Sequence, residues 1–218
     1  MVRIMNNRTK EGMGTHSGRT FIEEARRRQI VQHAVDVIAE HGFAGATLAR
    51  IAERAGISKG VISYHFDGKD DLMYEVLTLY ESEEQEFIYA RVDAQETATD
   101  ALQMYLRTNI EYMAVHPKHL KAVVEIVIAA KDSKGKRKFD VTSVEWMEDE
   151  LSRLVSILTR GQESGEFRTF DPRVMAISIR GAIENIAMYI LTYPDINVSD
   201  YADELTGMFM RATREDSG

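Results

Sequence analysis

Cysteine is absent from this chain of 218 residues. Without thiols there can be no disulfide framework, iron–sulfur cluster, thiolate zinc site or cysteine nucleophile. Proline is scarce, with three residues in all, and this leaves room for long uninterrupted helices. We expect neither a bound cofactor nor a metal. The lack of cysteine is consistent with a cytoplasmic protein.

Long apolar runs are also missing. Runs such as residues 126–130 are far shorter than the roughly 20 residues that a membrane span needs. The first 28 residues contain no apolar stretch of signal-peptide length. The sequence has no G-x-S-x-G, Walker or dinucleotide-binding motif. We therefore predict a cytoplasmic protein with no membrane partner that is not an enzyme.

The two ends of the chain differ in charge. The net charge is −8, but residues 1–69 contain 11 basic and 7 acidic residues, a net charge of +4. Residues 70–218 contain 16 basic and 28 acidic residues, a net charge of −12. A basic amino-terminal part on an acidic body indicates two functions in one chain.

Apolar residues recur at helical spacing along the whole chain. Ile30, Val31, Ala34, Val35 and Ile38 form one face of an amphipathic helix that Gly42 ends. No strand-like alternation is found, so the predicted fold is all-α. About nine helices are expected, over residues 24–41, 48–55, 58–64, 69–91, 99–115, 117–131, 138–162, 172–191 and 199–213.

Two short helices near the amino terminus fit a helix-turn-helix. Thr47 and Ser58 are suitable N-cap residues, and Gly56 lies in the turn between the two helices. Small residues, Ala52 and Ala55, allow the two helices to approach closely. The amino end of the second helix, beginning Ser58-Lys59-Gly60, then offers short side chains and backbone N–H groups to DNA.

The segment TLARIAERAGISKGVISYHF (residues 47–66), followed by KDDL (residues 69–72), resembles the DNA-binding domain of the tetracycline-repressor (TetR) family. The resemblance covers about residues 27–75. It implies a homodimeric transcriptional regulator, usually a repressor that a small-molecule inducer releases from a palindromic double-stranded DNA operator. The implied domains are a basic flexible arm (1–22), a helix-turn-helix DNA-binding domain (23–70) and a helical ligand-binding and dimerisation domain (71–218).

Several residues are candidates for DNA contact. Lys59, Val61 and Ser63 are placed to reach base edges, although Val61 and Ser63 depart from the usual family residues. The residues that match the phosphate-contacting positions of the family are Thr47, Tyr64, His65 and Lys69. The full candidate set is Thr47, Ser58, Lys59, Gly60, Val61, Ser63, Tyr64, His65 and Lys69. The run Arg26-Arg27-Arg28 is read either as a further DNA contact or as a solvated face paired with Glu23 and Glu24.

The segment 97–191 is rich in methionine and aromatic residues, which suit an adaptable ligand pocket and an ordinary core equally well. Glu125 and Glu184 interrupt apolar helices. Either acid is available to a cationic ligand, or forms an i,i+4 pair with Lys121 or Arg180 respectively. The candidate pocket, for a lipophilic and in one version cationic inducer, is Tyr105, Tyr112, Met113, Glu125, Trp146, Met147, Glu184 and Met188.

The last two helices, 172–191 and 199–213, are candidates for a dimer interface. The first is apolar on most of its faces, and such a helix must be buried on both sides. Two helices from each of two chains would form a four-helix bundle; the alternative is the core of a monomer. For function, the alternative to an inducible regulator is an inducer-independent structural DNA-binding or protein-interaction member of the same fold.

Overall fold

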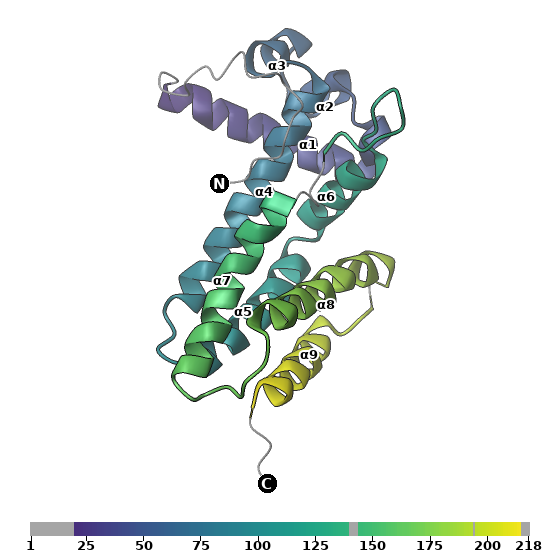
Figure 1. Cartoon of the computed structure of the whole chain (residues 1–218). Helices are drawn as coiled ribbons and strands as arrows, with labels where there is room; N and C mark the ends of the chain where they lie inside the picture. The colour runs from purple at the N-terminus through teal and green to yellow at the C-terminus, as the bar shows by residue number, and fades with distance from the viewer. Residues whose placement is uncertain (1–19, 140–143, 194, 215–218) are drawn as a thin grey trace. The chain divides into compact units, whose positions relative to one another are not determined.

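The computed structural model describes residues 20–139, 144–193 and 195–214. These residues form an all-helical fold, as predicted (Figure 1). An isolated bridge between Lys131 and Arg137 is the only strand-like pairing among them. The helices are α1 (Phe21–Gly45), α2 (Leu48–Arg54), α3 (Lys59–His65), α4 (Lys69–Val92), α5 (Ala98–Val115), α6 (Pro117–Ala129), α7 (Val144–Glu163), α8 (Pro172–Thr192) and α9 (Val198–Thr213).

The helix ends agree closely with the predicted ranges, with one clear exception. The helix expected from residue 138 begins only at Val144. Residues 131–138 fold into a tight turn instead, because Gly135 takes a positive φ of 77° and Asp132 accepts two backbone N–H groups. Gly42 also takes a positive φ, of 69°, and breaks α1 one turn before its end. The predicted arm, up to residue 19, lies outside the described residues.

The chain divides into two compact units. The first unit comprises residues 1–81 and 118–143, and the second comprises 82–117 and 144–218. This division does not coincide with the domain boundary expected after residue 70, because α4 continues through that boundary. It also assigns almost all of α6 to the same unit as the helix-turn-helix.

One apolar core holds the first unit together. Its fully buried members come from α1, α2, α3, the start of α4 and α6, so the helix-turn-helix is built on the same core as α6. Ile51 and Ile62 are completely buried and join α2 and α3 to α1. Burying side chains of this size stabilises the fold by about 1.5–3 kcal/mol each. The short helices α2 and α3 therefore depend on this core rather than on their own helical propensity.

The second unit is organised around α5, against which α7, α8 and α9 pack. Tyr105 and Tyr112 of α5 are 1% exposed and lie in its core. Where α7 turns toward α8, a Cβ on Gly161 would lie 2.1 Å from the ring of Phe167. Glycine is therefore required at residue 161 for this corner to close.

Helix α8 has two apolar sides. Ile179, Ile183 and Ile186 are buried in the second unit, whereas Val174 and Ile177 on the other side are 60% and 47% exposed. Among the described helices, α8 is the one long and apolar enough, by length and composition, to cross a membrane, and 22% of that stretch is buried. The search for uninterrupted apolar runs missed it because its polar residues are spread along its length.

Candidate nucleic-acid interface

The turn between α2 and α3 is formed by local contacts that the sequence predicts. Thr47 caps α2 by accepting the N–H of Arg50 at 3.2 Å, and Ser58 caps α3 by accepting the N–H of Val61 at 3.4 Å. Gly56 takes a positive φ of 65° in the turn. The N–H of Ile57 then bonds to the carbonyl of Ala52 at 3.0 Å. The predicted caps and turn are confirmed.

The amino-terminal half of α3 is exposed and polar. Ser58, Lys59, Gly60 and Ser63 are exposed, and Lys59 makes no hydrogen bond or ion pair within the described chain. A Cβ on Gly60 would meet only the hydroxyl of Ser58, at an ordinary 3.6 Å. The protein's own packing therefore does not require glycine here. The missing side chain instead leaves the end of α3 open to close approach from outside.

Tyr64 lies on the same exposed face, while its neighbours are more enclosed. Its side chain is 74% exposed, and its hydroxyl donates to Glu23 of α1 at 3.2 Å. The ring of His65 lies edge-on to that of Tyr64, with 5.0 Å between centroids. Val61 and His65 are partly buried and Thr47 is exposed, so the candidate residues are unequally accessible.

Lys69 has a partner inside the protein. Its ammonium donates to the carbonyl of Phe43 at 2.5 Å and lies 4.0 Å from the centroid of that ring. Burial lowers the pKa of Lys69. The phosphate contact expected from the resemblance thus competes with a contact that joins the start of α4 to the end of α1.

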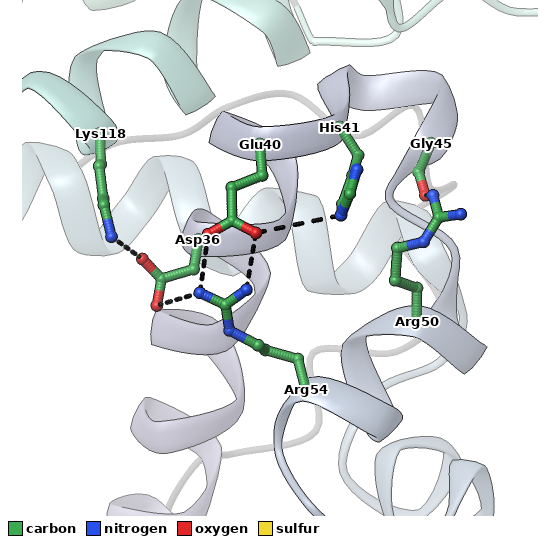
Figure 2. Close-up of polar contacts among 7 residues, drawn as sticks. All are labelled: Asp36, Glu40, His41, Gly45, Arg50, Arg54 and Lys118. Atoms are coloured by element: carbon green, nitrogen blue, oxygen red, sulfur yellow. Dashed lines mark hydrogen bonds and ion pairs between the residues drawn. The ribbon is translucent and has the colours of Figure 1, made fainter.

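A polar network fastens α2 to α1 (Figure 2). Arg54 donates to both carboxylate oxygens of Glu40, at 2.7 and 2.8 Å, and lies 3.9 Å from Asp36. Lys118 of α6 donates to Asp36 at 2.8 Å. The hydrogen bond from Arg54 lowers the pKa of Glu40. In a bidentate pair the carboxylate and the guanidinium fix each other's orientation. This network therefore helps to set the angle between α2 and α1.

The contacts of Arg27 show that it is neither a DNA contact nor part of a solvated face. Its side chain is buried, forms an ion pair with Glu75 of α4 at 2.7 Å, and lies 4.2 Å from the centroid of the Phe66 ring. It also donates to the carbonyl of His65 at the end of α3. Arg27 is therefore a support for α3, whereas Arg26 and Arg28 are exposed. The proposed pairing with Glu23 and Glu24 is not found among the described residues.

Glu125 does not share a unit with the rest of the predicted pocket. It lies in α6 of the first unit, where a carboxylate oxygen accepts the N–H of Phe43 at 3.2 Å. This contact joins α6 to the break that Gly42 makes in α1. The alternative i,i+4 pair between Lys121 and Glu125 is likewise not found in the described chain.

The remaining candidate pocket residues lie in the second unit. Tyr105, Tyr112 and Met113 are buried, and burial raises the pKa of the Tyr112 hydroxyl. Met188 is 47% exposed. The side chains of Trp146 and Met147 lie outside the described residues. The structure thus assigns three of these residues to the core and one to the surface.

The charged group that α8 buries is basic, not acidic. The Arg180 side chain is 13% exposed, and its guanidinium donates to the hydroxyl of Tyr105 at 3.2 Å and to the side-chain oxygen of Asn109 at 3.1 Å. It also pairs with Glu184 at 3.2 Å, and the side chain of Glu184 is 55% exposed. The i,i+4 pairing is confirmed for Glu184, which does not act as a buried acid.

Glu166 is a structural support that the sequence did not reveal. Its carboxylate accepts the N–H groups of Thr99 and Ala98, at 2.8 and 3.1 Å, and the hydroxyl of Ser164 at 2.9 Å. The Thr99 bond is the main reason that its pKa falls to about 2. Glu166 therefore caps the amino end of α5, 68 residues earlier in the chain.

Comparisons with known proteins agree with this architecture. The family model "Bacterial regulatory proteins, tetR family" matches residues 30–76. A BetI 1 regulator of Chromohalobacter salexigens is 50% identical over 52 residues, which are 24% of this chain and 26% of the relative. The fatty acid metabolism regulator of Bacillus subtilis is 28% identical over 159 residues, 72% of this chain and 78% of that protein.

Among solved structures, FadR of Bacillus subtilis in complex with stearoyl-CoA superposes with a TM-score of 0.68. The match covers 84% of this chain and 97% of that one, at 23% identity, and it supports the fold. The class defined by these matches is the helix-turn-helix transcriptional regulators. Residues 30–76 of the chain match the TetR family, and the chain is similar to a transcriptional regulator over most of its length.

Proposed function

We propose that the protein is a homodimeric DNA-binding repressor that a small lipophilic molecule releases from its operator. The observation that carries the proposal is the exposed, polar side of α3, with Lys59 and Ser63 outward and Gly60 near its amino end. A recognition helix needs this arrangement to enter the major groove of DNA. The relatives named above are regulators, which agrees with the proposal and favours no catalytic role.

The proposed dimer forms through α8 and α9. Exposed apolar side chains follow one side of α8 and extend to Met208 of α9, which is 57% exposed. Gly181 lies on the same side of α8, and a Cβ there would meet no atom within 4 Å. A second copy would cover this surface, and a two-fold axis would present two α3 helices to half-sites about 34–36 Å apart.

The proposed ligand binds in the second unit. A similar fold binds stearoyl-CoA in the Bacillus subtilis FadR structure, and this supports a lipophilic ligand here. A cationic ligand is no longer favoured, because both candidate acids have partners in the protein. Glu184 pairs with Arg180, and Glu125 bonds to Phe43 in the first unit. A ligand releases DNA only if it binds the DNA-free conformation more tightly.

One observation favours the inducer-independent alternative. Tyr105, Tyr112 and Met113, which we expected to line a pocket, are at most 5% exposed. If the aromatic residues of the second unit fill its core, the protein would bind DNA through the first unit without responding to a ligand. The two functions differ in one measurable respect, namely whether a lipophilic molecule changes the affinity for DNA.

The first experiment selects bound sequences from a pool of random duplexes with the purified full chain. We expect a palindromic sequence with two half-sites one helical turn apart. Failure to enrich any sequence, or enrichment of a single unrepeated site, would contradict the dimeric repressor.

The second experiment titrates long-chain acyl-CoA thioesters, free fatty acids and lipophilic cations against the complex with the selected duplex. Release by the anionic or neutral lipids supports the inducible repressor. If none of these compounds changes the affinity, the inducer-independent alternative is favoured.

A further inference from the structure

The turn between α6 and α7 carries a dense group of positive charges. We call residues 131–138 (KDSKGKRK) the basic turn; it contains five basic residues and one acidic residue. All eight residues are exposed. The rest of residues 70–218 contains 11 basic and 27 acidic residues, so the basic turn stands out against an acidic background. In Figure 1 it projects from the helices of the first unit.

The basic turn is held in a defined shape. The N–H of Asp132 bonds to the carbonyl of Lys136 at 2.8 Å, and the N–H of Lys138 bonds to the carbonyl of Ala130 at 2.9 Å. The carboxylate of Asp132 accepts the N–H groups of Lys134 and Lys136, at 2.8 and 2.9 Å. These bonds hold the like charges close together despite their mutual repulsion.

The basic turn is anchored to the core that supports the helix-turn-helix. Ala130 and Phe139, which flank it, are buried in the apolar core of the first unit. Lys138 donates to Asp70, in the first turn of α4, at 2.6 Å. Lys131, Lys134, Lys136 and Arg137 make no side-chain hydrogen bond or ion pair within the described chain. Four cations on a fixed support are thus available to a polyanion.

The helix-turn-helix itself has few cations to offer. Among its basic residues, Arg27 pairs with Glu75 and Arg54 with Glu40. Arg50 donates to the carbonyl of Gly45 at 2.6 Å, and Lys69 donates to Phe43. Phosphate contacts nevertheless supply most of the sequence-independent affinity of a protein for DNA. A protein with a net charge of −8 needs such contacts more than most.

We propose that the basic turn is a second DNA-binding element, which contacts the phosphate backbone next to the site reached by α3. It increases the affinity for all duplex sequences and does not contribute to sequence preference, since phosphate contacts carry no base information. The inference rests on the proposed function. It assigns a DNA-binding role to a segment far from the helix-turn-helix in sequence.

Salt dependence tests the proposal. The triple variant Lys134→Gln, Lys136→Gln, Arg137→Gln and the wild-type full chain are titrated against a mixed-sequence duplex at several salt concentrations. Each lost phosphate contact lowers the slope of log K against log salt by about 0.9, so we expect a decrease of up to about 3 per protomer. The affinity at low salt should fall at least ten-fold.

A matched control separates contact from net charge. The variant Arg91→Gln, Arg153→Gln, Arg160→Gln removes the same charge from exposed residues of the second unit outside α8 and α9. An unchanged slope for the turn variant, or an equal decrease for this control, would overturn the inference. If the wild-type chain binds no duplex at all, both the proposed function and this inference are wrong.

The absence of cysteine allows a positional test. Lys134→Cys creates the only thiol in the chain, to which an iron chelate that cleaves nearby DNA can be attached. We expect cuts confined to the backbone beside each half-site. The same label at Thr169→Cys in the second unit serves as the control. No cleavage from residue 134, in a complex that still forms, would also overturn the inference.

Discussion

Helices α3 and α8 each leave one side exposed, but the two sides differ in chemistry. The exposed side of α3 carries Lys59, Ser63 and the hydroxyl-bearing ring of Tyr64, with Lys59 as the charged residue at its amino end. The exposed side of α8 carries Val174, Ile177 and Met188. Water solvates the first surface well and the second poorly, so only the second gains free energy from burial alone. We infer that the exposed side of α3 suits a charged, hydrated partner, whereas the exposed side of α8 requires an apolar one.

The largest effect is expected on α8. Ile177→Glu combined with Gly181→Glu places two charges on its exposed apolar side and should convert the dimer to monomers. Because each monomer then binds one half-site by itself, operator affinity should fall about 100-fold or more. Sedimentation equilibrium measures the mass and anisotropy titration measures the affinity. Thr169→Glu, at an exposed residue before α8, is the control. If the double variant is still a dimer, the exposed apolar side of α8 is not the dimer interface, and the contrast with α3 fails.

The next effect concerns the support beneath α3. Arg27→Ala leaves the carboxylate of Glu75 without its ion-pair partner and the carbonyl of His65 without its donor. Loss of one partner from a buried pair should lower the free energy of unfolding by about 3 kcal/mol. Denaturant titration measures this loss. Arg28→Ala removes the neighbouring exposed arginine and should change little. Equal effects of the two substitutions would show that Arg27 is not a support.

A smaller effect is expected from the exposed side of α3. Lys59→Ala should weaken operator binding by about 1–3 kcal/mol and relax the preference at one base pair of each half-site. Stability should not change, since Lys59 makes no contact within the described chain. The preference is measured by repeating the selection with the variant. Lys121→Ala, on the exposed side of α6, provides the comparison. A uniform loss across all sequences would instead make Lys59 a phosphate contact.

The smallest effect is a pH dependence in the unit that contains α8. The pKa of Glu166 is about 2 in the folded protein, below its ordinary 4.5. Its stabilising contribution is therefore present above about pH 4.5 and is lost as the pH falls toward 2. Glu166→Gln should lower the Tm at pH 7, and the difference from the wild type should shrink between these pH values. Glu163→Gln neutralises an exposed carboxylate nearby as a control. A difference independent of pH would show that charge is not responsible.

Local signals in the sequence were sufficient for most of the fold and for the position of the DNA-binding element. Thr47 and Ser58 cap the predicted helices, and Gly42 and Gly56 take the positive φ values that end helices. Each of these effects involves residues within about four positions of one another. The helix predicted from residue 138 was wrong at its start because Asp132 and Gly135 form a turn whose hydrogen bonds compete with the helix.

The contacts that position the candidate site were harder to predict, because their partners lie far apart in the chain. Arg27 and Glu75 are 48 residues apart, and Phe43 and Glu125 are 82 apart. Periodicity identifies the side of a helix that is buried but not the residue it meets. For this reason Glu125 was grouped with a pocket in the second unit, although it completes the end of α1 in the first.

The sequence by itself determined the all-α class, the places where helices begin and end, and the helix-turn-helix with its outward residues. It did so because helix caps, glycine turns and amphipathic spacing act within a few residues. Only the tertiary structure decided which charges are available to a partner. It paired Arg27 and Arg54 inside the first unit, buried Arg180 in place of an acid, and exposed the cations of the basic turn. Those outcomes depend on which side chains come together when distant helices pack, and this packing minimises buried unpaired charge over the whole chain.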